Sequence, residues 1–181
     1  MDNIEFARNH RISINLNYSV APHHSGVWPI HNELYKMWSN FSVKATSTES
    51  YPGTFPLSKR RGFIYNNLMV LPRYPSGVFT FNHFFDQLIY TKKHWKSLTE
   101  GGNLFEMILY NQVNIFMTHF GNYGNDRIAM YLFENVFAFS SCWTNLKYYA
   151  LPPLEIANKY FELHPLEMEP VWFVCKTHFC K

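Results

Sequence analysis

Apolar residues occur along this chain in short blocks, and the spacing within the blocks predicts alternating strands and helices. Short apolar runs bounded by turn residues predict strands at 18–21, 43–46, 62–65, 68–71, 114–119 and 146–150. Helical spacing and helix-start residues predict helices at 29–41, 103–110, 125–139 and 152–162. We therefore expect an α/β fold with strands alternating with helices, either part of a parallel (β/α) barrel or an open sheet covered by helices.

Two details of this pattern make sharper predictions. Asn66 and Asn67 separate two apolar runs, and Asn tolerates the left-handed backbone of tight turns, so the pair predicts a β-hairpin inserted into the alternating pattern. In the helix predicted at 29–41 the apolar spacing predicts one buried face, made of Ile30, Leu34, Met37, Trp38 and Phe41.

The stretch 114–127 carries the strongest candidate for chemistry. It reads as a strand, a Gly- and Asn-rich loop and the start of a helix, with His119 at the tip of the strand. In α/β folds functional groups collect in loops at the carboxyl ends of strands. Asn125 is the predicted N-cap, with Asp126 and Arg127 in the first helical turn. The alternative is that His119 only ends the strand and Asp126 only supports the helix start.

Two further polar groups follow predicted strands, namely the pair His23-His24 and Arg73. In a barrel-like fold these residues and His119 would face the same mouth. Each one taken singly has a structural explanation, since the histidines suit a surface loop and Arg73 suits an ion pair.

Composition narrows the class of protein. Hydrophobic residues make up 47% and charged residues 16% of the 181 positions, which is typical of a folded domain. A net charge of +3 argues against a nucleic-acid-binding protein, although the basic run 59–61 suits a polyanion or a solvated turn. The aromatic content of 19% suits a thick core and also a sugar-binding cleft.

Several catalytic motifs are missing from the sequence. No two of the nine histidines are four positions apart, so no metal ligands are assigned. The sequence also contains neither a phosphate-binding loop nor a serine nucleophile elbow. Cys142, Cys175 and Cys180 lack Cys-x-x-Cys spacing, and the last two can pair with each other or with another chain. No apolar run reaches the length of about 20 residues that a membrane span needs. The residues alone thus offer a proton donor without a nucleophile.

Distinctive strings spread in order over nearly the whole chain resemble the deacetylase domain of the heparan sulfate N-deacetylase/N-sulfotransferase family. They are 6–10, 18–27, 46–49, 60–64, 69–73, 115–119, 122–127, 141–146 and 159–161, and the similarity is poorest at 80–96. The resemblance implies a polysaccharide-deacetylase-like (β/α) barrel. It implies Golgi enzymes in which a metal-dependent deacetylase domain removes acetyl groups from N-acetylglucosamine of the heparan sulfate precursor polysaccharide. A second domain sulfates the freed amine with 3′-phosphoadenosine 5′-phosphosulfate.

For the mechanism, the resemblance implies that a metal-bound water attacks the acetamide and that a histidine in the Met117-Thr118-His119 string protonates the departing amine. His119 is therefore the expected general acid. The expected substrate-binding residues are His23, His24, Arg61, Arg73, Asp126 and Arg127.

The sequence also departs from the family. The family's paired aspartates and His-x-x-x-His metal ligands lie upstream of position 1, and its sulfotransferase domain lies downstream of position 181. We therefore expect residues 1–165 to be the carboxyl-terminal part of an N-deacetylase domain and 166–181 a tail toward the sulfotransferase domain. On this hypothesis the chain is a fragment that is inactive alone. The alternative is a non-catalytic module that binds glycan or regulates a partner.

Overall fold

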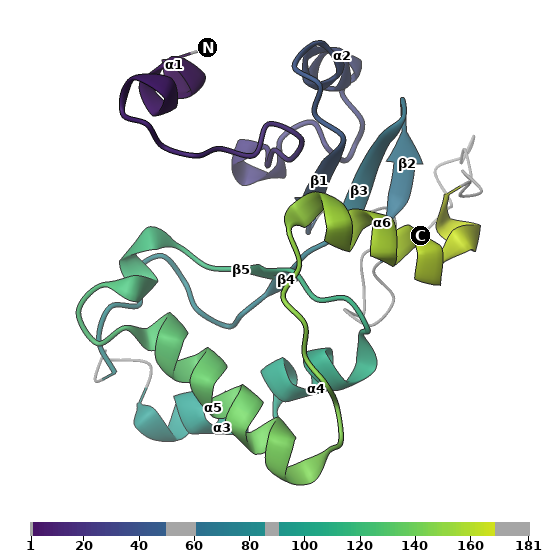
Figure 1. Ribbon diagram of the computed structural model, residues 1–181. Coiled ribbons are helices and arrows are strands. Elements are labelled where there is room, and N and C mark those ends of the chain that lie inside the picture. The colour runs from purple at the N-terminus through teal and green to yellow at the C-terminus, as the bar shows by residue number, and fades with distance from the viewer. Residues whose placement is uncertain (1, 50–60, 86–90, 169–181) are drawn as a thin grey trace, which may run out of the picture.

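The computed structural model describes residues 2–49, 61–85 and 91–168 and has a mixed α/β architecture (Figure 1). Its helices are α1 (Asp2–Asn9), α2 (Asn32–Asn40), α3 (Lys92–Thr99), α4 (Asn103–Tyr110), α5 (Ile128–Trp143) and α6 (Pro153–Leu163). Its strands are β1 (Ala45–Thr48), β2 (Phe63–Tyr65), β3 (Leu68–Pro72), β4 (Tyr74–Pro75) and β5 (Phe116–Met117). Short 3-10 helices lie at η1 (Pro22–His24), η3 (Phe120–Tyr123) and η4 (Pro165–Glu167).

The larger sheet has the strand order β1-β3-β2, with β1 parallel and β2 antiparallel to β3. Asn66 and Asn67 join β2 to β3 with φ values of 48° and 59°, the left-handed conformation that a two-residue hairpin turn requires. The predicted hairpin is therefore confirmed.

Helices α2 and α6 pack on opposite faces of this sheet, because successive side chains of β3 point to opposite sides. Leu68 and Val70 pack in one core cluster with Tyr35 and Trp38 of α2. Leu71 packs in another cluster with the buried residues of α6, which are Ala157, Tyr160 and Phe161. Burying each such large apolar side chain contributes about 1.5–3 kcal/mol, so this α/β/α sandwich holds β1 and β3 firmly in place.

The predicted buried face of the helix at 29–41 is wrong in part. Trp38 is buried, but Met37 is 57% exposed and Phe41 is 41% exposed, and Tyr35 is buried in their place. The helix begins at Asn32 and not near Pro29, and the buried Tyr35 hydroxyl donates to the carbonyl of Val27 at 2.9 Å.

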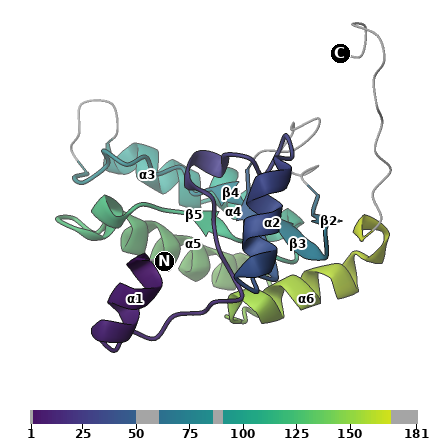
Figure 2. The same cartoon turned by 90° about the horizontal axis from the view of Figure 1, so that it is seen from above.

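A second body lies below the sheet in Figure 1 and consists of α3, α4 and α5. Its core contains Trp95, Leu104, Ile128 and Leu132, all nearly inaccessible to solvent. The two bodies are joined by the short parallel ladder of β4 and β5, in which Tyr74 opposes Phe116 and Pro75 opposes Met117. Seen from above, α3 and α5 lie side by side, while α1 lies at the edge of the molecule in both views (Figure 2).

Other elements differ from the sequence prediction. The strand predicted at 18–21 is reduced to one bridge between Tyr18 and Ala45, and residues 146–150 form no strand. Tyr148 instead packs its ring against Phe137 of α5 at 5.0 Å between centroids, which takes this segment away from the sheet. The fold class α/β is confirmed, but the described strands form two small sheets and no closed barrel. None of the helices seen in the described ranges is long and apolar enough to cross a membrane.

Candidate functional site

Strand β1 is unusual because three of its four buried residues are polar. Thr46, Ser47 and Thr48 are fully buried, and the hydroxyls of Ser47 and Tyr18 lie 2.6 Å apart. Burial raises the pKa of Tyr18, while its hydrogen bond to Ser47 and the nearby charge of Arg73 oppose the rise. Burying a hydroxyl costs free energy unless it is hydrogen-bonded. A core strand with three buried hydroxyl residues therefore indicates that these residues have a role besides packing.

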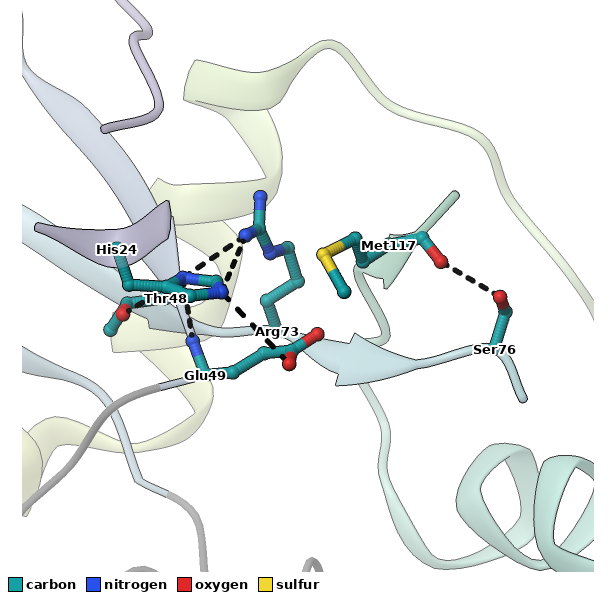
Figure 3. Close-up of polar contacts among 6 residues, drawn as sticks. All are labelled: His24, Thr48, Glu49, Arg73, Ser76 and Met117. Carbon is teal, nitrogen blue, oxygen red and sulfur yellow. Dashed lines mark hydrogen bonds and ion pairs between the residues drawn. The ribbon is translucent and has the colours of Figure 1, made fainter. Parts of the chain in front are cut away.

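Three ionisable groups meet at the carboxyl end of this strand (Figure 3). The Nδ1 atom of His24 lies 3.4 Å from Thr48 Oγ1 and accepts from the backbone N–H of Glu49 at 3.3 Å. One terminal nitrogen of Arg73 lies 3.0 Å from His24 Nδ1 and 3.1 Å from Nε2. The Glu49 carboxylate lies 3.9 Å from Nε2. His24 and Arg73, both predicted from the sequence, are thus brought into contact.

The two distances from Arg73 to the His24 ring define how the groups are stacked. An atom in the ring plane cannot be equally close to both nitrogens without overlapping Cε1, so the guanidinium lies over the face of the imidazole. Arginine commonly stacks on flat rings in this way. Because the side chain of His24 is only 16% exposed, the stack fixes both groups in position.

A divalent metal does not fit this cluster. His24 and Glu49 are the two groups of metal-donor type here, and the part of the chain that the structure describes holds no group of three such side chains. The positive guanidinium of Arg73 on the imidazole face also opposes a second cation. No reaction step is therefore assigned to a metal at these residues.

His119 lies two residues beyond the end of β5, in the loop where the sequence predicts it. Its backbone N–H donates to Asn122 Oδ1 at 2.8 Å. Asn122 is fully buried, and its amide nitrogen donates to the carbonyls of Phe79 at 2.7 Å and Asn82 at 3.0 Å. The His119 loop is thereby fastened to the segment 79–85 across the chain.

The imidazole of His119 is half-buried and faces the backbone N–H of Asn122 in a capping-box arrangement at the start of η3. Its buried Nδ1 atom makes no hydrogen bond of normal geometry within the described ranges. A buried polar atom without a partner costs about 1–3 kcal/mol, and such groups in native proteins call for a functional explanation. The sequence pattern predicted His119 at the same mouth as His24 and Arg73. Among the described residues, His119 makes no direct contact with the His24–Arg73 cluster.

The structure corrects the predicted start of the helix after His119. Helix α5 begins at Ile128 with Arg127 as its N-cap at φ 51°, so Asp126 and Arg127 precede the first turn and Asn125 is not the cap. Asp126 instead accepts from the backbone N–H of Phe85 at 2.8 Å. Both Asp126 and Arg127 are exposed.

The remaining predicted residues lie elsewhere. His23 is exposed on η1. Arg61 lies next to β2, and its Nε lies 3.3 Å from the carboxylate of Glu167, which also accepts from Gly62 N–H at 2.8 Å and from the Tyr160 hydroxyl. Burial and the neighbouring carboxylate raise the pKa of Tyr160 far above its usual value. Cys142 is exposed, whereas Lys59, Arg60, Cys175 and Cys180 lie outside the described residues.

The sequence interpretation missed Thr48, Glu49 and Asn122 as parts of these sites. For the first two a signal existed, since hydroxyl residues at 46–48 followed by Glu49 end a strand in the same way as the predicted polar groups. Asn122 had no such signal, because its role depends on Phe79 and Asn82, which are about 40 positions away.

Parallel strands with ionic side chains at their carboxyl ends are the arrangement found in enzymes of the α/β class. The model of the family described as heparan sulfate-N-deacetylase, deacetylase domain, matches residues 1–105. The chain therefore belongs to this family. The matched region contains His24, Glu49 and Arg73 and ends before His119.

Similar proteins carry the same description. The chain is 48% identical over 171 residues to the bifunctional heparan sulfate N-deacetylase/N-sulfotransferase of Drosophila melanogaster, covering 94% of this chain and 16% of the relative. It is 47% identical to N-deacetylase/N-sulfotransferase 2 of Homo sapiens, covering 94% of this chain and 19% of the relative. It is 48% identical to N-deacetylase/N-sulfotransferase 4 of Mus musculus, covering 94% of this chain and 20% of the relative. The chain thus spans a fifth or less of these relatives.

Proposed function

We propose that this chain forms the substrate-facing part of a heparan sulfate N-deacetylase, a domain that hydrolyses the N-acetyl group of N-acetylglucosamine in the heparan sulfate precursor. The observation that carries the proposal is the half-buried His119 imidazole just beyond the end of β5. Its Nδ1 atom is buried, so the substrate reaches the ring through Nε2, which is the atom assigned to proton transfer.

The chemistry requires a proton donor at this position. Cleaving an acetamide expels an amine, and an amide anion is a poor leaving group, so a positioned acid must protonate the nitrogen as the C–N bond breaks. His119 in its imidazolium form delivers that proton. The Asn122 contacts keep the loop in place, so the acid does not have to be ordered when substrate binds.

The His24–Arg73 cluster serves substrate binding in this proposal. Arg73 is held on the His24 face at 3.0 Å, with Glu49 close to the same ring. The Arg73 guanidinium offers N–H donors and the Glu49 carboxylate offers acceptors to the hydroxyl groups of the polysaccharide at the carboxyl end of β1. His23, Arg127 and Asp126 are exposed, so they contact the glycan at its edges.

We propose that the larger enzyme supplies what these residues lack. The two small sheets become part of a (β/α) barrel, and the catalytic divalent metal is held by other residues of that barrel. The sulfotransferase cofactor 3′-phosphoadenosine 5′-phosphosulfate belongs to a separate domain, and the enzyme works in the Golgi lumen. The chain alone is therefore inactive.

The test compares binding with turnover in one preparation of the 181-residue chain. N-acetylheparosan is expected to bind, with an affinity that His24→Ala lowers and Lys147→Ala leaves unchanged, while no acetate is released when Zn²⁺, Co²⁺ or Mn²⁺ is added. Lys147 is exposed beyond α5 and serves as the matched control. Acetate release by the chain alone would overturn the assignment of the metal to other residues, and absence of glycan binding would overturn the substrate-facing role.

A second candidate is a non-catalytic glycan-binding module. It is favoured by one observation, the pocket around Arg61 described in the next subsection, because His119 is not among the residues that line it. Binding that is unaffected by His24→Ala but lost with Arg61→Ala favours this module over the enzyme part.

A further inference from the structure

A pocket of about 280 Å³ lies between the end of α4, helix α6 and the start of β2. The residues that line it are Arg61, Tyr74, Tyr110, Asn111, Gln112, Val113, Tyr160 and His164. In Figure 1 the chain leaving α4 rises toward the β4–β5 ladder beneath α6. Its volume is near the lower end of the range of about 300–1,000 Å³ for ligand sites, so it suits one sugar unit and not a long chain segment.

The charge of the lining is one-sided. Arg61 and His164 are basic and every other lining residue is neutral, so none of the described residues that line the hollow carries a carboxylate. The carboxylate of Glu167 is not part of the lining and lies 3.3 Å from Arg61 Nε and 3.9 Å from His164 Nδ1. Glu167 therefore orients both basic groups, and their remaining N–H groups are donors for an anion.

The orientation of Arg61 is secured by a buried network. Glu167 also accepts from Gly62 N–H at 2.8 Å and from the Tyr160 hydroxyl, and Gly62 N–H lies 2.7 Å from that hydroxyl oxygen. An added Cβ at Gly62 would lie 2.6 Å from Tyr160 Cε1, so the backbone and the ring are in close contact. The Arg61 side chain is 56% exposed, which lets an oriented guanidinium reach solvent.

The rim of the pocket adds a flat apolar surface. Tyr110 ends α4 and is 69% exposed, whereas Tyr74 and Tyr160 are buried in the wall. Asn111 is held by its contacts to the Tyr74 hydroxyl at 3.1 Å and to the Met107 carbonyl at 2.8 Å. An exposed ring beside fixed amides and a cation is the combination that binds a sugar, because a ring covers the apolar sugar face while donors bind its oxygens.

We propose that this pocket is an accessory subsite for one uronic-acid unit of an acidic polysaccharide, with its carboxylate on Arg61 and its ring on Tyr110. The choice of polysaccharide rests on the proposed function, but the subsite is separate from His119. Such a subsite holds the polymer on the chain away from the position where the acetamide is cleaved. It explains why a tyrosine stays exposed beside an arginine that a buried network orients.

The test measures the affinity of the 181-residue chain for an N-acetylheparosan octasaccharide and for the same octasaccharide with its carboxyl groups reduced to alcohols. Losing a charge-assisted hydrogen bond weakens binding by about tenfold or more. The reduced ligand and the Arg61→Gln variant are each expected to show this loss, and combining them is expected to add little. Tyr110→Ala is expected to weaken both ligands equally, because the ring contacts the sugar face.

Matched controls separate this subsite from general charge attraction. Arg8→Gln and Tyr149→Ala change exposed residues of the same types in α1 and in the segment after α5, and each is expected to alter the affinity less than twofold. If Arg61→Gln unfolds through loss of the Glu167 contact, the exposed Gln112→Ala variant replaces it, with the same expectation of weakened binding.

Three results would overturn the subsite: equal affinity for native and reduced ligands, Tyr110→Ala without effect, or Arg61→Gln and Arg8→Gln with equal effects. The last result means non-specific attraction that salt screens. Lys147→Ala is expected to retain this binding in full, because Lys147 is exposed and does not line the pocket. The subsite is tested by binding and the deacetylase proposal by acetate release, so failure of either one leaves the other intact.

Discussion

Asn122 is the side chain that most directly holds the His119 loop in place, and its replacement tests that structure. Asn122→Ala removes three hydrogen bonds, one accepted from His119 N–H and two donated to the carbonyls of Phe79 and Asn82. Asn122 is fully buried, so the three backbone groups are left without easy access to water. At about 1 kcal/mol for each bond the variant is expected to lose about 3 kcal/mol of its free energy of unfolding.

Urea unfolding followed by tryptophan fluorescence measures this loss. With a slope of about 2 kcal/mol per molar urea, a loss of about 3 kcal/mol lowers the midpoint by about 1.5 M. Asn158→Ala on the exposed face of α6 is the matched control and is expected to change the stability by less than about 0.5 kcal/mol.

A second variant separates hydrogen bonding from packing. Asn122→Asp keeps the size of the side chain and the acceptor for His119 N–H, but it places a carboxylate against the Phe79 and Asn82 carbonyls. It is expected to be at least as damaging as Asn122→Ala. If Asn122→Asp is neutral, or if Asn122→Ala costs under about 1 kcal/mol, the reasoning that the two donated bonds hold the loop is refuted.

Three further predictions concern the sandwich of α2, the sheet and α6. Burial raises the pKa values of Tyr35 and Tyr160 above the ordinary 10.0, so above pH 10 the unfolded chain loses protons that the folded chain keeps. Stability is therefore expected to fall by about 1.4 kcal/mol per pH unit for each such tyrosine, and Tyr160→Phe is expected to reduce that slope in urea titrations at pH 10–11.5. Gly62→Ala is expected to cost about 1–3 kcal/mol in thermal unfolding, because its Cβ would lie 2.6 Å from the Tyr160 ring; no loss of melting temperature contradicts the tight contact. Asn67→Val is expected to cost about 1–2 kcal/mol at φ 59°, while Asn67→Gly costs nothing, and equal stability of the two contradicts the left-handed turn.

The sequence predicted elements whose cause is local. The hairpin at Asn66-Asn67 and the helix at Asn103–Tyr110 follow from turn chemistry and helical spacing, and both are present. The strand predicted at 146–150 was wrong: Tyr148 packs on Phe137, eleven positions earlier in α5, so this segment lies against the helix and pairs with no strand.

In the candidate site, too, features with a local cause were predictable and features set by distant contacts were not. The position of His119 at the end of a strand was predictable, because a short apolar run followed by Gly and Asn marks that junction. The start of α5 was predicted three residues too early, because the residue pattern places Asp126 inside the first helical turn. In the structure the Asp126 carboxylate instead accepts from the backbone N–H of Phe85, which is distant in the sequence. The contact of Arg73 with His24 depends on the parallel pairing of β1 with β3, which residue spacing does not specify.

The central claim is that His119 protonates the departing amine, and its role is tested in a full-length enzyme by changing the leaving group. In a full-length relative whose position aligned with His119 also holds histidine, that histidine is replaced by glutamine, and hydrolysis is measured on N-acetylheparosan and on an aryl acetate ester. An aryl oxide departs without protonation, whereas an amine requires an acid. The account predicts that the substitution lowers the amide kcat by about 10²–10⁴-fold and leaves ester hydrolysis nearly unchanged. Equal losses on both substrates, or no loss on the amide, would contradict it.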